Sequence, residues 1–371
     1  MRIFHLCLCN RWGGQEMLVH KVALAQKQRG HQICIVARQE SPLAKAAELD
    51  GLELILYQSG FQRLTFPWKL RKETLKGEDP VLHFHQLRAV RRFIPFLPRT
   101  GNYVFTEHSP RPKSIASFYN SMVLSRLQRI IVVSKAQRQL ISKQLGLREE
   151  QLSVVYNGID PLHYHPLGKK EREQARRDYE LPQGEKIVVC AGRLSEHKGQ
   201  DLFLEAAKSI LETRSDLRFE ICGDIEAKTA SQRDFIEALK SAIPPRHSGR
   251  IHFRGFVEDI AKYLACVDMV VMPSRYEPFG LVAAEAMACG TRLVVSRAGA
   301  LPEVVEQGKY ARLVENEDPK DLARGIRESL EEQDHSSLEK ARQYVVEKFS
   351  LDSHLDSLEE IYRSCSCSSK K

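Results

Sequence analysis

The feature that most constrains this chain is a regular alternation between short apolar runs and longer amphipathic segments. The first runs are RIFHLCLC, HQICIVA and LELILY, and the segments between them are GQEMLVHKVALAQKQRG and SPLAKAAEL. Buried parallel strands are apolar along their length, and each one reaches the next through a crossover helix. The alternation therefore predicts βαβ units on a parallel sheet.

The alternation stops once and then begins again, which predicts two domains. Further strands are expected at 80–85, 102–107, 129–133 and 152–155 in the first half, and at 187–191, 217–222, 250–254, 267–272, 292–295 and 311–314 in the second. A polar, charged stretch near residues 160–185 separates the two series. We expect an α/β protein of two doubly wound, Rossmann-like domains facing a cleft, with residues 1–165 in the first and 166–349 in the second.

Composition narrows the class of protein. Hydrophobic residues make up 42% and charged residues 28%, which does not suit a disordered or fibrous chain. Nine cysteines cannot all pair within one chain, and most lie in apolar runs, so they indicate buried thiols in a reducing compartment. No apolar run approaches the ~20 residues of a membrane-spanning helix, and the opening residues do not form a secretion signal. We expect a cytoplasmic protein.

The strongest motif follows the apolar run MVVMP and occupies residues 277–290. Pro278 and Gly280 set a tight turn, and the helix expected after it presents unpaired backbone N–H groups suited to a phosphate or sugar oxygen. Glu277 lies before the turn. Glu285 lies in an otherwise apolar run, where an unpaired carboxylate would be costly to bury. The two carboxylates can address different parts of one ligand; the alternative is a helix cap and a surface acid.

A second motif, at residues 192–199, follows the run IVVCA. Arg193 and Lys198 place two cations in a strand-to-helix loop, where they suit a diphosphate that departs as a leaving group. Neither the spacing of a Walker A loop nor any Gly-x-Gly occurs, so the usual nucleotide fingerprints are missing. The alternative is that both cations are simply solvated.

Weaker candidates lie in the first half. Gly13 and Gly14 follow the first strand and suit a loop that faces a ligand, although a plain turn is the alternative. His108 follows the run YVFTE and should stand at the edge of the cleft. His83 and His85 would share one strand face, but no third ligand has suitable spacing, so no metal site is expected. The segment 157–160, Asn-Gly-Ile-Asp, closes the first domain, and a plain turn is the alternative interpretation.

The first half is also basic. Residues 1–165 carry 24 Lys and Arg against 12 Asp and Glu. Cations alternate with apolar side chains between residues 83 and 113, and the cations are Arg88, Arg91, Arg92, Arg99, Arg111 and Lys113. Such a stretch fits an anionic membrane surface or a phosphorylated lipid acceptor, and could equally meet nucleic acid. A solvated surface is the remaining alternative.

Together these motifs resemble the retaining glycosyltransferases of the GT-B fold, family four. An early Gly-Gly loop, a His in mid-domain, Asn-Gly-Ile-Asp, Gly-Arg with a downstream Lys-Gly, and Glu-x7-Glu occur in that order over nearly the whole chain. The resemblance implies that Arg193 and Lys198 bind a donor diphosphate and that Glu285 binds ribose hydroxyls. Glu277 and the backbone of residues 279–281 would bind the transferred sugar, with His108 beside it.

The resemblance extends to the remaining donor-binding set and to the end of the chain. The implied donor contacts also include Gly13, Gly14, Phe256, Val257, Phe279, Gly280 and Leu281, with residues 254–257 framing the base. The final helix, near residues 350–363, would return to pack on the first domain. His108, Arg193, Lys198 and Glu277 are the expected catalytic set.

The implied reaction moves a sugar from a UDP- or GDP-linked donor to a cell-envelope glycan or glycolipid such as lipopolysaccharide core or lipid A. The departing phosphate helps to take the acceptor proton, so the site needs cations more than a nucleophile. No metal, further cofactor or nucleic-acid partner is expected. Peripheral contact with the inner face of the cytoplasmic membrane is expected. The alternatives are a nucleotide-sugar epimerase of the same fold, or a non-catalytic protein that binds membranes or nucleic acid.

Overall fold

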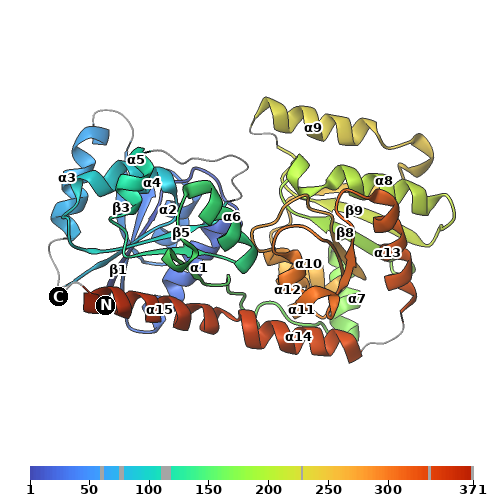
Figure 1. Ribbon diagram of the computed structural model, residues 1–371. Helices are drawn as coiled ribbons and strands as arrows, with labels where there is room; N and C mark the ends of the chain where they lie inside the picture. The colour runs from blue at the N-terminus through green and yellow to red at the C-terminus, as the bar shows by residue number, and fades with distance from the viewer. Residues whose placement is uncertain (59–61, 75–78, 110–117, 227–228, 333–335, 369–371) are drawn as a thin grey trace. The chain divides into compact units, whose positions relative to one another are not determined.

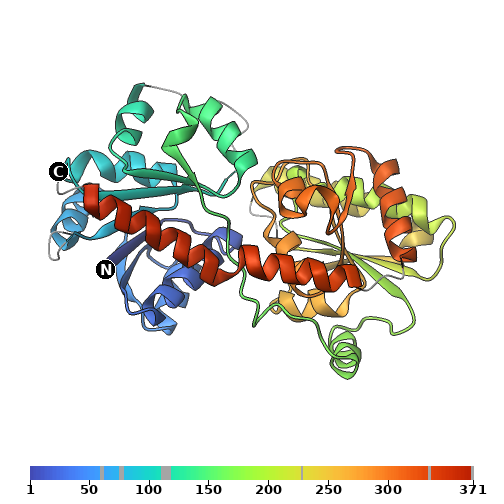
Figure 2. The same ribbon diagram turned by 60° about the horizontal axis from the view of Figure 1, so that its bottom comes forward.

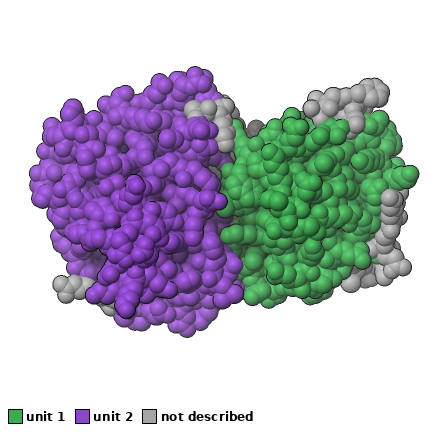
Figure 3. All heavy atoms as spheres, turned by 180° about the vertical axis from the view of Figure 1, so that it is seen from behind, with its two compact units in different colours: residues 1–158, 351–371 green, residues 159–350 purple. Residues whose placement is uncertain are grey.

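The computed structural model describes the chain except for residues 59–61, 75–78, 110–117, 227–228, 333–335 and 369–371. It divides into two compact units (Figure 3), which are Met1–Gly158 with Leu351–Lys371, and Ile159–Ser350. The sequence placed this boundary at residue 165. In the structure Ile159 already belongs to unit 2, because it pairs with Ser350 and donates its N–H to the carbonyl of Phe349 at 2.8 Å.

Unit 1 is a parallel sheet in the order β3-β2-β1-β4-β5-β6-β7. Its strands are β1 (Arg2–Cys7), β2 (Gln32–Arg38), β3 (Glu53–Tyr57), β4 (Val81–Phe84), β5 (Asn102–Glu107), β6 (Arg129–Val132) and β7 (Leu152–Val154). Its helices are α1 (Gly14–Gln28), α2 (Pro42–Leu49), α3 (Gln62–Thr74), α4 (Leu87–Phe93), α5 (Phe118–Leu124), α6 (Lys135–Leu145) and α15 (Leu351–Ser368).

Helices cover both faces of this sheet, because alternate side chains of each strand point to opposite faces. On one face Phe4 and Phe84 pack with residues of α3, α4, α5 and α6. On the other face Ile3 and Val81 pack with residues of α1, α2 and α15. Unit 1 is therefore doubly wound, as the alternating pattern predicts.

The last helix, α15, belongs to unit 1, as the resemblance implied. Leu355, Leu358 and Tyr362 are buried in the core that also holds α1 and α2. Figure 2 shows the helix, in red, lying along the sheet of unit 1. Cys365 is 2% exposed, so the helix is packed against unit 1 as far as this residue.

Unit 2 contains a second parallel sheet, in the order β10-β9-β8-β11-β12-β13. Figure 1 labels β8 and β9 of this sheet and the helices around it. Its strands are β8 (Lys186–Ala191), β9 (Leu217–Cys222), β10 (Ile251–Gly255), β11 (Met269–Met272), β12 (Arg292–Ser296) and β13 (Arg312–Val314). Its helices are α7 (Lys169–Asp178), α8 (Gln200–Leu211), α9 (Ala230–Ser241), α10 (Ile260–Cys266), α11 (Leu281–Ala288), α12 (Leu301–Val304), α13 (Pro319–Glu331) and α14 (Ser336–Phe349).

The core of unit 2 fixes where its loops lie. Phe203 of α8, Ile236 of α9 and Ile326 of α13 pack with Val188 and Phe219 on one face of the sheet, while α11 contacts β11 and β12. Strand order reverses direction between β8 and β11 in this unit and between β1 and β4 in unit 1. Ligands of open α/β sheets bind beyond the carboxyl ends of the strands at such reversal points.

Candidate active site

Two of the predicted motifs meet at the reversal point of unit 2. The loop 192–199 follows β8, and the loop 273–280 follows its sheet neighbour β11. Lys198 from the first loop places Nζ 2.5 Å from Oε2 of Glu277 in the second. The Glu277 side chain is only 9% exposed, and Ser274 donates a long hydrogen bond, 3.5 Å, to the same carboxylate oxygen. A buried carboxylate and a partly exposed ammonium therefore stand together at the strand ends.

The loop that carries Lys198 is held by hydrogen bonds from Gln200 and by close packing at Gly199. Buried Gln200 donates to the carbonyl of Arg193 at 2.9 Å and accepts from the N–H of Ser195 at 3.3 Å. Gly199 has φ +71, and a Cβ there would lie 2.0 Å from the carbonyl oxygen of Pro273. The 3₁₀ turn η3 (Glu196–Lys198) therefore packs against the neighbouring loop as closely as glycine allows.

Arg193 differs from Lys198 in its surroundings. It is exposed, and its guanidinium has no hydrogen bond or ion pair with any residue that the structure describes. A cation that has no internal partner keeps its charge and its donors for a ligand. Of the two predicted cations of this loop, Lys198 is paired with Glu277, and Arg193 has no partner among the described residues.

The turn before α11 depends on two glycines. Gly280 has φ +100, and Gly299 has φ +54 with its Cα so close to Glu277 that a Cβ would lie 2.2 Å from the Glu277 carbonyl oxygen. Ala300 donates its N–H to that same carbonyl at 2.8 Å. Phe279 is buried against Phe349. The backbone of residues 279–281 therefore lies at the N-terminal end of a helix, where anions are favoured.

Glu285 has a partner that the sequence did not reveal. It lies in α11, and the Tyr164 hydroxyl, which comes from the segment just after the start of unit 2, hydrogen-bonds to its carboxylate. Burial, and then the neighbouring negative charge of Glu285, raise the pKa of Tyr164 well above its usual range. Glu285 is therefore neither a lone buried charge nor a free surface acid.

In the segment 254–257, at the end of β10, one side chain is bonded within the unit and the next two are accessible. Arg254 donates to Oε2 of buried Glu220 at 3.1 Å and to the carbonyl of Tyr179 at 2.8 Å, which makes it part of the sheet. Phe256 is 61% exposed and Val257 is half-buried. Phe256 and Val257, not Arg254, are the part of this segment that is open to a ligand.

Unit 1 has its own cluster at the reversal point between β1 and β4. Gly13 caps α1, which begins at Gly14 as expected. His108, half-buried after β5, accepts or donates a 3.0 Å hydrogen bond between its Nε2 and Nδ1 of His85. His85 in turn contacts His5 of β1 at 3.0 Å. His108 thus lies just beyond the carboxyl end of β5, an interior strand of the sheet, and at the end of a histidine chain that the sequence did not predict.

The third ligand that the sequence lacked for His83 and His85 is His5. Strand register pairs His5 with His83, and the nitrogens of these three rings come within 4.8 Å of one another. Both nitrogens of His5 and both of His83 already have hydrogen-bond partners. The cluster is therefore complete as a hydrogen-bonded network. Cys7, Cys9 and Glu16 form a second group whose possible metal-ligand atoms lie within 4.8 Å of one another.

Family comparisons cover most of both units. The family Glycosyltransferase Family 4 matches residues 12–162, and the family Glycosyl transferases group 1 matches residues 171–348. The chain belongs to the group 1 glycosyl transferases. Unit 2, with the Lys198 and Glu277 pair, contains the whole of the group 1 match.

Individual relatives of this group 1 glycosyl transferase agree with the assignment. It is 32% identical over 239 residues to an uncharacterized glycosyltransferase of Methanocaldococcus jannaschii, covering 63% of this chain and 59% of that protein. It is 28% identical over 272 residues to D-inositol 3-phosphate glycosyltransferase of Corynebacterium urealyticum, covering 72% and 64%. The chain thus spans less than two thirds of the length of these curated relatives.

A solved structure extends the likeness to the whole fold. Anabaena Alr3699/HepE in complex with UDP-glucose superimposes with a TM-score of 0.85 at 21% identity, covering 98% of this chain and 100% of that one. At this identity the likeness establishes the fold. The expected GT-B fold class is confirmed.

The basic stretch of this group 1 glycosyl transferase is only partly as predicted. Arg88, Arg91 and Arg99 are exposed on and after α4, while Arg92 contacts the Tyr57 hydroxyl at 2.5 Å. The apolar side chains between them mostly face the core, because Phe93, Ile94 and Leu97 are buried. The exposed large apolar side chains nearby are Phe96, Trp68, Tyr119 and Met122. Arg111 and Lys113 lie outside the described residues.

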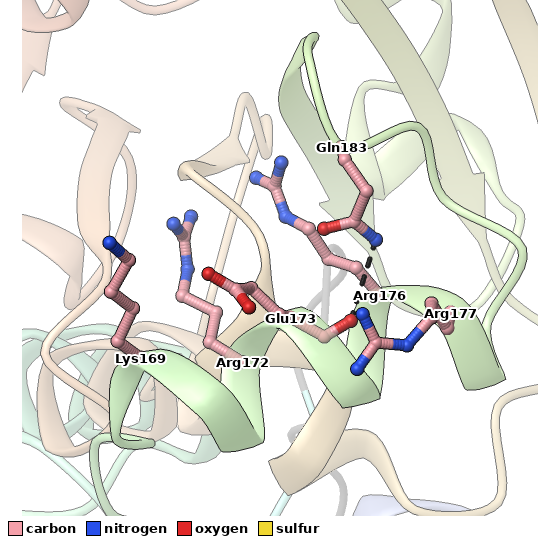
Figure 4. A pocket seen from close by; sticks show the side chains of 6 residues that line it. All are labelled: Lys169, Arg172, Glu173, Arg176, Arg177 and Gln183. Atoms are coloured by element: carbon pink, nitrogen blue, oxygen red, sulfur yellow. Dashed lines mark hydrogen bonds between the residues drawn. The ribbon is translucent and has the colours of Figure 1, made fainter.

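A cavity of about 390 Å³ lies elsewhere in unit 2, beside α7. Figure 4 shows its lining side chains, which are Lys169, Arg172, Glu173, Arg176, Arg177 and Gln183. Arg172 and Arg176 both pair with Asp268, at 2.8 and 2.6 Å, so much of the positive charge is neutralised internally. None of the predicted site residues lines this cavity.

Among the described residues, no helix is both long and apolar enough to cross a membrane.

Proposed function

We propose that this protein transfers a sugar from a nucleotide diphosphate sugar to an acceptor hydroxyl, with retention of the anomeric configuration. The observation that carries the proposal is the Lys198 and Glu277 pair at the reversal point of unit 2. The open cation of Arg193 and the N-terminal end of α11 lie on the same two loops. Two cations and the N-terminal end of a helix suit a diphosphate that gains negative charge as it leaves.

The roles of the side chains follow from their surroundings. Lys198 and Arg193 bind the diphosphate and stabilise its charge. Glu277 fixes the position of Lys198 and accepts hydrogen bonds from sugar hydroxyls. The backbone of residues 279–281 also binds the transferred sugar. Glu285, oriented by Tyr164, accepts from the ribose hydroxyls, and Phe256 and Val257 border the base.

The bond changes need no side-chain nucleophile. The acceptor oxygen bonds to the anomeric carbon on the face from which the phosphate departs, and the acceptor proton passes to a departing phosphate oxygen. Unit 1 contributes His108 to sugar recognition and the Gly13 and Gly14 loop to donor binding. No metal ion or further cofactor enters this scheme, and turnover that is unchanged by EDTA is its expected signature.

The proposed donor is UDP- or GDP-linked, and the complex of HepE with UDP-glucose supports the UDP-linked case. In a panel of UDP, GDP, ADP and CMP, UDP or GDP at about 100 times its Kd should raise the melting temperature by about 5 °C or more. Glu285→Gln should reduce this shift, because it weakens acceptance from the ribose. Glu205→Gln, an exposed carboxylate of α8, is the matched control. No shift with any of the four nucleotides would contradict the proposal.

The acceptor is proposed to be a cell-envelope glycan or glycolipid such as lipopolysaccharide core, reached at the inner face of the cytoplasmic membrane. Exposed Arg88, Arg91 and Arg99 beside exposed Trp68 and Phe96 support this. Such a surface suits anionic lipid headgroups.

Replacing Arg88, Arg91, Arg92 and Arg99 together with glutamine should weaken binding to anionic liposomes by about a hundredfold or more, since each cation near such a surface contributes about 1 kcal/mol. Co-sedimentation measures this. The control changes Arg246, Arg297, Arg312 and Arg324 of unit 2, which alters net charge equally. Equal loss in both quadruple variants would show a non-specific charge effect and defeat the membrane assignment.

A further inference from the structure

A chain of hydrogen bonds runs through the interior of unit 1 and ends at His108. Oε1 of Gln26, in α1, lies 2.7 Å from Nε2 of His5. Nδ1 of His5 lies 3.0 Å from Nε2 of His85, and Nδ1 of His85 lies 3.0 Å from Nε2 of His108. Gln26 and His5 are 0% exposed and His85 is 5% exposed. His108, half-buried, is the end of the chain nearest to solvent.

The rings of this chain are neutral. Burial lowers the pKa of His5 to about 4 and lowers the pKa of His85 well below its usual range, where the neighbouring His83 adds to the effect. Burial also lowers the pKa of His108, followed by a smaller contribution from His354. A neutral imidazole carries one N–H and one lone pair, so each ring must donate on one side and accept on the other.

The acceptor at the start then sets the direction of every later bond. Because an amide oxygen only accepts, His5 must donate through Nε2 and accept at Nδ1. His85 must therefore donate from Nε2 to His5, and His108 must donate from Nε2 to Nδ1 of His85. The remaining nitrogen, Nδ1 of His108, is left with a lone pair, and it has no hydrogen-bond partner among the described residues.

We propose that Gln26, His5 and His85 are positioning residues that hold His108 in its Nε2–H tautomer, so that Nδ1 faces the substrate as a hydrogen-bond acceptor. This inference rests on the proposed function only in making a sugar hydroxyl the group that donates to Nδ1. Only the tautomer with a lone pair on Nδ1 can accept from the ligand, so binding is not weakened by a population of the other tautomer. The same set explains why His5 is buried in the largely apolar strand β1 and why Gln26 is buried in α1.

A second network braces the chain. His83, whose ring lies tilted beside that of His85 with centroids 4.2 Å apart, contacts the Tyr362 hydroxyl of α15 and the Thr106 hydroxyl, each at 2.7 Å. Both partners are themselves buried. His83 therefore has no nitrogen left to compete for His5 or His85, and the direction imposed by Gln26 is preserved.

The direct test is a long-range ¹H–¹⁵N spectrum of the ¹⁵N-labelled full-length protein, which reports the tautomer of each histidine. We expect His5, His85 and His108 to be neutral and protonated at Nε2. In Gln26→Met, which keeps the side-chain volume but removes the amide oxygen, the His108 signal should become that of mixed tautomers. The matched control is Gln137→Met, because Gln137 is an equally buried glutamine of unit 1 whose oxygen accepts from Val133 N–H and not from a histidine.

Kinetics supply the second readout. Gln26→Met should lower kcat/KM for the donor about tenfold, the expected effect of one misdirected hydrogen bond, while Gln137→Met lowers melting temperature to a similar degree with kcat/KM unchanged. A wild-type His108 protonated at Nδ1 or on both nitrogens would overturn the inference, as would an unchanged tautomer in Gln26→Met. If the wild-type protein transfers no sugar, the proposed function fails, but the spectrum still decides the tautomer.

Discussion

Replacing Lys198 with alanine is expected to lower kcat by about a hundred- to a thousandfold, the usual effect of removing one group that stabilises developing charge in a transition state. Lys198 is the cation held in place by Glu277, at 2.5 Å. Arg193 alone cannot replace it, because Arg193 is exposed and its guanidinium has no partner among the described residues to orient it. Initial rates with a saturating donor measure the effect.

The variant also leaves the 9% exposed Glu277 carboxylate without its cation, so the free energy of unfolding should fall by about 1–3 kcal/mol. A denaturant titration separates this loss from the loss of turnover. Lys208→Ala is the matched control, because Lys208 forms a similar 2.6 Å ion pair with Glu205 in α8, away from the two loops. Near-normal turnover by Lys198→Ala, with the fold intact, would show that the diphosphate is held elsewhere.

The sequence predicted the strands closely, and the reason is physical. A strand buried on both faces of a parallel sheet must be apolar throughout, so runs such as 217–222 and 102–107 coincide with β9 and β5. Helix α11 begins at Leu281, where the turn formed by Pro278 and Gly280 predicts its start. Local rules of this kind do not depend on which elements become neighbours.

The contacts that complete the site could not be predicted in the same way, because they join residues far apart in sequence. Tyr164 reaches Glu285, and His5 joins His83 only once β1 and β4 pair. In the basic stretch the sequence did not decide which side chains are exposed. Its apolar residues could have faced solvent or core, and burial of Phe93 and Leu97 decides that most of them face the core.

Replacing Gly299 with alanine should disrupt the site from a position that touches no substrate. Its φ of +54 strains any other residue, and the new Cβ would lie 2.2 Å from the carbonyl oxygen and 2.8 Å from the nitrogen of Glu277. The obstacle is backbone, so the loop of Glu277 must move. We expect the free energy of unfolding to fall by about 2–4 kcal/mol and kcat to fall about a hundredfold, since a displacement of about 1 Å in a positioning group has that effect.

Gly249→Ala separates this effect from the general cost of changing a glycine. A Cβ at Gly249 meets nothing within 4 Å, so stability and turnover should stay close to wild type. A Gly299→Ala protein with a lower melting temperature but full kcat would mean that Glu277 tolerates movement. In that case Glu277 would matter for the stability of the loop, and Lys198 would have to be oriented during transfer by the bound donor itself.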